Sequence, residues 1–150
     1  MNSPFDSLLN SLQVESTESK FRQLISNIIM INSTEILNMV KGRLKYGEGV
    51  NGGKIGTYKS NEYAVFKNKQ NPLAGFGNVD LFLTGELTDN ITVRRKGDRM
   101  EIISTDEKYS KIANKYGAYQ FGLTDEQMQE FLQECYYVAL ESLINKTYGK

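Results

Sequence analysis

The sequence predicts an α+β protein with helices at both ends of the chain and a small antiparallel sheet between them. Apolar residues recur at helical spacing through residues 4–45. Residues 91–104 alternate around Gly97-Asp98, which is typical of a hairpin with a two-residue turn. Residues 125–144 carry an apolar face at helical spacing. We therefore expect N-terminal helices, a sheet with a protruding hairpin, and a long C-terminal helix packed on the sheet.

The N-terminal region is expected to contain two or three helices. Ser16–Ser19 interrupts the apolar pattern, and Asn32 with Glu35 three residues later has the spacing of a capping box. Because 150 residues are an ordinary size for one domain, we treat the chain as a single domain overall. Within it, residues 1–32 are assigned as a helical arm and residues 33–150 as the α+β domain.

The middle of the chain combines glycine-rich and apolar stretches. Residues 45–78 hold seven of the 13 glycines, and Ser60 is expected to cap a short helix there. The rest of this stretch is predicted to be a long loop that orders against a partner. Val79–Leu87 is predicted to be an apolar strand that ends at Thr84-Gly85 and supplies the core of the sheet.

The C-terminal part offers the clearest local signals for helices. Residues 106–115 are expected to form a short helix that Gly117 ends. Thr124 with Gln127 three residues later is the strongest helix start in the chain. The apolar face of the following helix is assigned to Met128, Phe131, Leu132, Cys135, Val138, Ala139 and Ser142/Leu143, which predicts a buried, inert thiol at Cys135.

The hairpin carries the only dense cationic cluster that the sequence reveals. Its turn sets a register in which Arg94 opposes Glu101, a favourable pair, and Lys96 opposes Arg99, a like-charge pair. Residues 125–134 hold four acids and no base. A basic tip and an acidic helix on one chain suit head-to-tail contact between copies, which closes into a ring when the rotation allows.

The composition indicates contact surfaces and no catalytic machinery. Histidine is absent, which removes the usual general base and the commonest metal ligand. The 18 bases and 18 acids balance, so no global field steers the chain to nucleic acid. We expect no enzymatic activity, no cofactor and no metal. The candidate interaction residues are Gly53, Lys54, Tyr58, Arg94, Arg95, Lys96, Arg99, Glu130 and Glu134.

Three weaker patterns favour ordinary interpretations. Gly47–Gly52 spells G-x-G-x-x-G, but a helix precedes it and more glycine follows, so we expect a loop rather than a dinucleotide site. Asp80, Glu86 and Asp89 lack EF-hand spacing, and an acid-only metalloenzyme is the least favoured alternative. The longest apolar run, Ile28–Ile31, is too short to cross a bilayer. No signal peptide is expected either. Together these two features predict that the protein is made and folded in the cytoplasm.

Four motifs, in this order, resemble the small neck and tail-completion proteins of tailed bacteriophages. They are Gly53-Lys54-Ile55-Gly56-x-Tyr58-Lys59, Leu81-Phe82-Leu83-Thr84-Gly85-Glu86-Leu87, Lys115-Tyr-Gly117 and Phe121-Gly-Leu-Thr-Asp-Glu126. The similarity is to virion-morphogenesis and head–tail connector proteins, including ring proteins of crAss-like phages. It covers about residues 33–145.

The resemblance implies a structural virion protein that forms a sixfold or twelvefold ring between portal and tail. Its partners would be copies of itself, the portal and other neck or tail proteins, with weak contact to DNA in the lumen and none to membrane. It would reside in the virion, and in the host cytoplasm during assembly. The alternative is a small cytoplasmic nucleic-acid-binding or regulatory protein that uses the basic hairpin with Tyr46, Tyr58 and Tyr63 as stacking groups.

Overall fold

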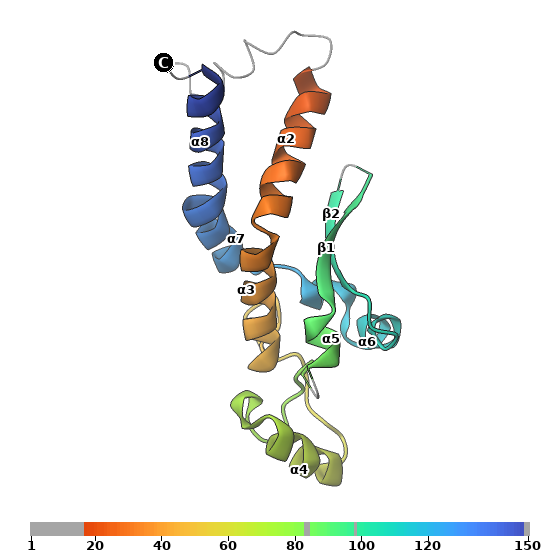
Figure 1. The fold of residues 1–150 in the computed structure, drawn as a ribbon. Helices are drawn as coiled ribbons and strands as arrows, with labels where there is room; N and C mark the ends of the chain where they lie inside the picture. Colours follow the sequence, from red (N-terminus) through yellow and green to blue (C-terminus); the bar gives the residue numbers. More distant parts are fainter. Residues whose placement is uncertain (1–16, 83–84, 98, 149–150) are drawn as a thin grey trace. The chain divides into compact units, whose positions relative to one another are not determined.

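The computed structural model describes residues 17–82, 85–97 and 99–148, and it confirms the α+β class (Figure 1). The helix expected within residues 4–15 lies outside the described residues. The elements are α2 (Thr17–Ile31), α3 (Ser33–Lys45), α4 (Asn61–Gln70), η2 (Pro72–Ala74), α5 (Glu86–Asp89), β1 (Ile91–Lys96), β2 (Arg99–Ser104), α6 (Tyr109–Tyr116), η3 (Ala118–Phe121), α7 (Asp125–Phe131), the π-helix η4 (Leu132–Tyr136) and α8 (Tyr137–Tyr148).

Contacts divide the chain into two compact units. One unit comprises the described parts of residues 1–32 and 129–150, and the other comprises residues 33–128. In the first unit, Ile28 of α2 and Leu140 of α8 are buried together, with Leu24, Tyr136 and Ala139 packed around them. The second unit holds the larger apolar core and the sheet.

The core of the second unit is built on α3. Ile36, Val40 and Leu44 recur every four residues and are buried, which gives the helix one apolar face. Val40 and Leu44 pack with Phe121 of η3 and with further core residues of the segments around it, namely Val79, Leu81, Leu87 and Ile91. Within this unit α3 packs against β1, and η3 packs against β2.

The predicted strand at Val79–Leu87 is wrong. Within the described residues the sheet has two strands, β1 and β2, and the segment from Val79 to Phe82 belongs to neither. The backbone of Val79 donates to the Gly56 carbonyl, but Asp80 then turns its carboxylate back to accept from the Phe82 amide. Consecutive residues 79–81 are all buried, so the alternation that a half-exposed strand requires is lost. Gly85, at φ +88°, starts the short helix α5, and Leu83 and Thr84 lie outside the described residues.

The hairpin register is confirmed. Val93 pairs with Ile102, Arg94 with Glu101 and Lys96 with Arg99 across the two antiparallel strands. Gly97 adopts φ +59°, the left-handed conformation that a two-residue turn demands, while Asp98 is outside the described residues. The like-charge pairing at the tip is relieved because the Lys96 ammonium lies 3.4 Å from Glu101.

The stretch 45–78 is more ordered than the long loop that was predicted. The Ser60 hydroxyl accepts from the Tyr63 amide at the start of α4, which confirms the expected cap. Asn71 then caps η2. The glycine-rich part closes on itself through an isolated bridge between Glu48 and Lys54, so its order comes from contacts within the chain.

The expected short helix and the expected helix start are both confirmed. Gly117 ends α6, and its amide donates to the Ala113 carbonyl. Thr124 and Gln127 form a reciprocal capping box, with the Thr124 hydroxyl accepting from the Gln127 amide at 3.0 Å and the Gln127 side chain accepting from the Thr124 amide at 3.1 Å.

The C-terminal helix is interrupted by the π-helix η4, which changes its buried face. The Tyr137 amide donates to the Leu132 carbonyl, five residues back, so this turn holds an additional residue. Beyond it Leu140 is buried, whereas Val138, expected on the apolar face, is 59% exposed. Met128 is also exposed, and Cys135 is half-buried rather than fully buried. The predicted burial of this face is therefore confirmed at Phe131, which is buried, but is wrong at Met128 and Val138, which are exposed.

Candidate functional site

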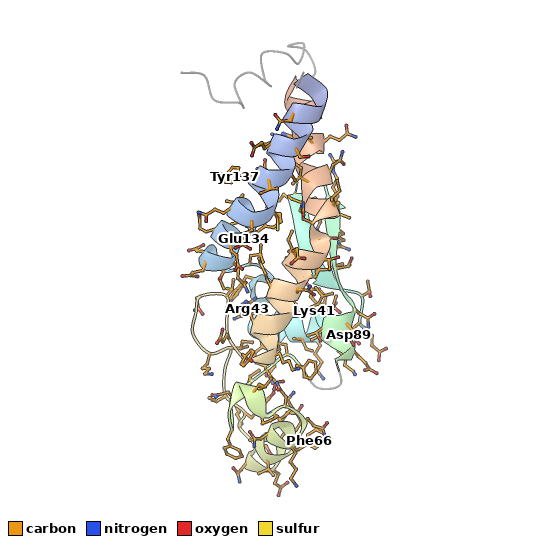
Figure 2. All side chains as sticks on the ribbon, turned by 60° about the vertical axis from the view of Figure 1, so that its left-hand side comes forward. Lys41, Arg43, Phe66, Asp89, Glu134 and Tyr137 are labelled. Carbon is orange, nitrogen blue, oxygen red and sulfur yellow. The ribbon has the colours of Figure 1, made fainter. Side chains whose placement is uncertain are left out.

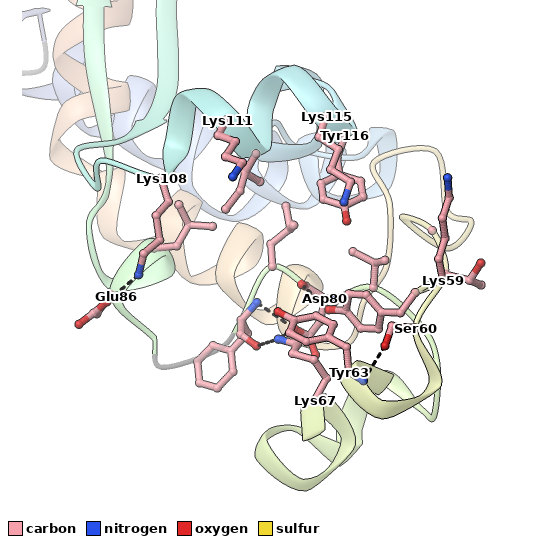
Figure 3. Close-up of a pocket in the computed structure, with 18 residues that line it drawn as sticks. Lys59, Ser60, Tyr63, Lys67, Asp80, Glu86, Lys108, Lys111, Lys115 and Tyr116 are labelled. Carbon is pink, nitrogen blue, oxygen red and sulfur yellow. Dashed lines mark hydrogen bonds and ion pairs between the residues drawn. The ribbon is translucent and has the colours of Figure 1, made fainter. Parts of the chain in front are cut away.

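A pocket of about 730 Å³ lies in the second unit, between the loop leading into α4, the segment around Asp80, and α6 (Figure 3). Its floor is apolar and consists of core residues, chiefly Val79, Leu81 and Leu87. Its size falls within the range usual for binding sites of small ligands or of inserted side chains. The pocket is therefore the leading candidate for a functional site.

The rim of the pocket is cationic. Lys111 and Lys115 come from α6, Lys108 from just before it, and Lys59 from the loop that precedes α4, and all four are exposed. Lys108 is 3.3 Å from Glu86, and the pKa of Lys108 is raised because Glu86 accepts its hydrogen bond. Among the described residues, no carboxylate lies within ion-pair distance of Lys59, Lys111 or Lys115. The rim thus offers three cations to an anionic partner.

A buried ion pair holds the floor of the pocket in place. The Lys67 ammonium contacts the Asp80 carboxylate and the Phe82 carbonyl, and both side chains are buried. Asn71 donates to the same carboxylate at 3.0 Å and to the Lys45 carbonyl at 2.6 Å. This network ties α4 to the segment 79–82, so its role is to fix the floor rather than to receive a ligand.

Aromatic rings form one wall. The Tyr58 hydroxyl donates to the Asp80 carbonyl at 3.4 Å and accepts from the Asp80 amide at 3.3 Å. The Tyr58 ring lies 5.0 Å from that of Tyr63, edge to face, and Tyr63 lies 6.0 Å from Phe66. The Lys115 ammonium lies 5.1 Å from the centre of the Tyr116 ring. Such a wall suits an aromatic or aliphatic group that enters beside a negative charge.

Tyr58 is expected to make stability depend on pH in the alkaline range. Burial, followed by the charge of Asp80, raises the pKa of Tyr58 above its ordinary value of 10.0. The folded state then holds this proton more tightly than the unfolded chain, so the contribution is complete below about pH 10 and is lost as the pH rises further. Tyr58→Phe should flatten the fall in unfolding free energy between about pH 9.5 and 11, by at most about 1.4 kcal/mol per pH unit. Urea titrations at several pH values measure it, and parallel curves would contradict it.

The glycine-rich loop is held by a buried arginine and lacks the helix that normally follows a dinucleotide-binding loop. Arg43 of α3 donates to the carbonyls of Glu48 at 2.7 Å and Gly122 at 2.8 Å, and also to that of Gln120. The Gln120 side chain in turn accepts from the Val50 amide at 3.0 Å. Binding of a pyrophosphate would require a helix that begins directly after this loop, and no helix begins there. The expectation of a loop is confirmed.

The predicted interaction residues fall in four separate places. Gly53 and Lys54 are exposed on the glycine-rich loop, and Tyr58 is a half-buried wall of the pocket. Arg94, Arg95, Lys96 and Arg99 are exposed on the hairpin, while Glu130 and Glu134 are exposed on α7 and η4. Two of the hairpin cations are already engaged, because Glu101 lies 3.1 Å from Arg94 and also pairs with Lys96. The Arg94 contact lowers the pKa of Glu101.

Sequence reasoning missed the lysines of α6. The hairpin is not the only dense cationic cluster, since Lys108, Lys111 and Lys115 gather on the pocket rim with Lys59. Their spacing of three and four residues places them on one face of a helix that the sequence did predict. This spacing is the sequence signal that could have identified these lysines. It does not identify the loop that carries Lys59, which lies about fifty residues earlier in the chain.

Two of the three acids considered for a metal site, Asp80 and Glu86, serve other contacts. Asp80 binds Lys67 and Asn71, and Glu86 binds Lys108. In residues 17–82, 85–97 and 99–148 no group of three or more cysteine, aspartate or glutamate side chains is arranged to hold a metal ion. Across the same residues, none of the helices combines the length and the apolar character needed to span a membrane.

Comparison of the chain with models of protein families, with curated proteins and with solved structures finds no match.

Proposed function

We propose that this chain is a structural subunit of a tailed-bacteriophage virion that forms a ring in the neck, at the head–tail connector, or completes the tail. It acts without enzymatic activity, and its partners are copies of itself, the portal and neighbouring neck or tail proteins. The proposal rests on the order of the four motifs and on surface features that suit assembly. The virion is its final location, after assembly in the host cytoplasm.

The observation that carries the proposal is a dense run of exposed apolar side chains on α4 and the residues after it. Tyr63, Val65, Phe66, Leu73 and Phe76 are all exposed, by 39% to 57%, within fourteen residues. Single exposed apolar residues are common, but such a concentration marks surfaces that other proteins cover. Phe66 projects from α4 in Figure 2. We call residues 63–76 the apolar segment.

Three of the four motifs behind the resemblance also meet in space. Tyr58 and Lys59 of the first motif, Leu81 and Glu86 of the second, and Lys115 of the third all line the pocket. Motifs that lie far apart in the sequence therefore form one local structure, as expected when they serve one function. Ring subunits need such a rigid element together with surfaces that fit their neighbours.

Adding a charge to the apolar segment provides the test. Phe66→Glu places a charge within the proposed interface and is expected to convert a ring of defined high mass into monomers or small oligomers. Native mass spectrometry of the full chain at moderate salt measures this. Ser110→Glu adds a charge at an exposed position outside both the apolar segment and the pocket, so it is the control and should leave the mass unchanged. A wild-type chain that stays monomeric at high concentration, and that is absent from assembled particles, would refute the proposal.

A second candidate function, binding of single-stranded nucleic acid, is favoured by one observation. Three lysines without an ion-pair partner among the described residues surround Tyr63 and Tyr116, and aromatic rings with nearby cations are the usual platform for unpaired bases. A monomer that binds single strands in a salt-dependent way would support it instead. The basic hairpin would then add phosphate contacts.

A further inference from the structure

The cations of the pocket rim need an anionic partner, and the chain itself carries a suitable surface. Glu130 and Glu134 are exposed, one helical turn apart, and Tyr137, three residues further on, is 54% exposed. Figure 2 shows Glu134 and Tyr137 on the same side of the C-terminal helix. Residues 125–134 contain no base, so no neighbouring cation in the sequence neutralises these carboxylates. We call Glu130, Glu134 and Tyr137 the acidic stripe.

The pocket and the acidic stripe are complementary in charge and in chemistry. The rim lysines Lys59, Lys111 and Lys115 are opposite in charge to the two carboxylates of the acidic stripe. The wall formed by Tyr58, Tyr63 and Tyr116 suits one inserted aromatic ring, which Tyr137 of the stripe supplies. The chain has a net charge of zero, so the excess cations of the one surface are balanced by excess acids elsewhere on the same chain. Complementary patches of this kind steer association and fix its register.

We propose that the lysine-rimmed pocket binds the acidic stripe of a second copy of this chain, with Tyr137 against the aromatic wall and Glu130 and Glu134 beside the rim lysines. The two patches differ, so the contact is head-to-tail, the type that generates rings. This inference rests on the proposed function and names the surfaces that the ring would use. It replaces the hairpin as the basic partner, because Arg94 and Lys96 already share Glu101.

The pocket is also continuous with the apolar segment. Tyr63 lines the pocket and lies 6.0 Å, ring to ring, from Phe66, so one neighbour covers both when it docks. Aromatic residues at the centre of an interface with charges at its edge are the usual arrangement of strong contacts. The occupant is therefore a folded helix of a second copy rather than a small free anion.

A charge-swap experiment tests the pairing on the full chain. Lys111→Glu/Lys115→Glu and, separately, Glu130→Lys/Glu134→Lys should each weaken self-association about tenfold or more at moderate salt. All four positions are exposed, so both variants should fold like the wild type, as circular dichroism checks. Mixing the two variants should restore the wild-type mass, because each pocket then meets a stripe of opposite charge. Arg99→Glu on the hairpin is the matched control and should associate normally.

The outcomes separate this inference from the proposed function. A ring that forms normally from both reversed variants, or that mixing fails to restore, overturns the inference and leaves the proposed function standing. A wild-type chain that never associates overturns both. Binding of a single-stranded oligonucleotide that Lys111→Glu/Lys115→Glu abolishes and Glu130→Lys/Glu134→Lys leaves intact would assign the pocket to nucleic acid, and would also overturn the inference.

Discussion

Replacing Lys67 by alanine is expected to lower the free energy of unfolding by about 3–5 kcal/mol, because it leaves the buried carboxylate of Asp80 without its cation. The Lys67 side chain is 4% exposed and that of Asp80 is 1% exposed, so water cannot take the place of the ammonium without opening the floor of the pocket. Asn71 and the Phe82 amide still donate to Asp80, but neither carries charge. The loss is a large share of the stability of an ordinary domain. Urea or thermal unfolding measures it.

Two further variants decide whether the charge itself is responsible. Lys67→Met/Asp80→Asn removes both charges and keeps similar volumes, so it should recover much of the stability that Lys67→Ala loses. Lys69→Ala, on an exposed site of the same helix, should change stability by no more than about 0.5 kcal/mol. A loss below about 1 kcal/mol for Lys67→Ala would show that the pair lies in a wetter environment than its burial indicates.

Features that depend on neighbouring residues could be predicted from the sequence. The hairpin register follows from one glycine turn and the alternation on each side of it, and the caps at Ser60 and Thr124 follow from spacings of three residues. Each of these signals is complete within a few residues. The α+β class rests on such signals and could therefore be predicted.

Features that depend on distant partners could not be predicted from the sequence. Asp80 interrupts what looks like an apolar strand, and its partner Lys67 lies in a different element. The π-helix η4 also depends on the folded structure: beyond it Val138 is exposed and Leu140 is buried. The spacing of apolar residues does not reveal it, because the additional residue in this turn rotates the buried face of the helix only from the turn onward.

The candidate site was predicted in part for the same reason. The position of Tyr58 beside lysine and glycine predicts a contact residue, and Tyr58 does line the pocket. The pocket also needs Lys111 and Lys115, which arrive only when α6 folds over the loop that contains Tyr58. A single sequence shows that each segment is cationic, but not that the two segments share one cavity.

Replacing Arg43 by methionine is expected to cost about 3 kcal/mol or more, the second large effect. Methionine fills a similar space but cannot donate to the carbonyls of Glu48, Gln120 and Gly122, and hydrogen bonds from a charged group contribute about 1.5–3 kcal/mol each. Arg43 is buried, and desolvation by that burial lowers its pKa. The planar guanidinium of Arg43 reaches three acceptors, which a single lysine ammonium cannot reach at once. Arg43→Lys should therefore lose nearly as much unfolding free energy as Arg43→Met.

The effect of Arg43→Met should also be local, which distinguishes loss of the clamp from general damage to the core. The amide of Val50 is held by the Gln120 side chain, whose backbone Arg43 fixes, so its hydrogen exchange should accelerate by more than that of the Thr92 amide, which belongs to a hydrogen-bonded pair of the β1–β2 ladder. Lys41→Met, two residues away on α3 and only half-buried, should leave both exchange rates and the stability close to wild type. Equal acceleration at Val50 and Thr92 would mean that Arg43 supports the whole core rather than the glycine-rich loop.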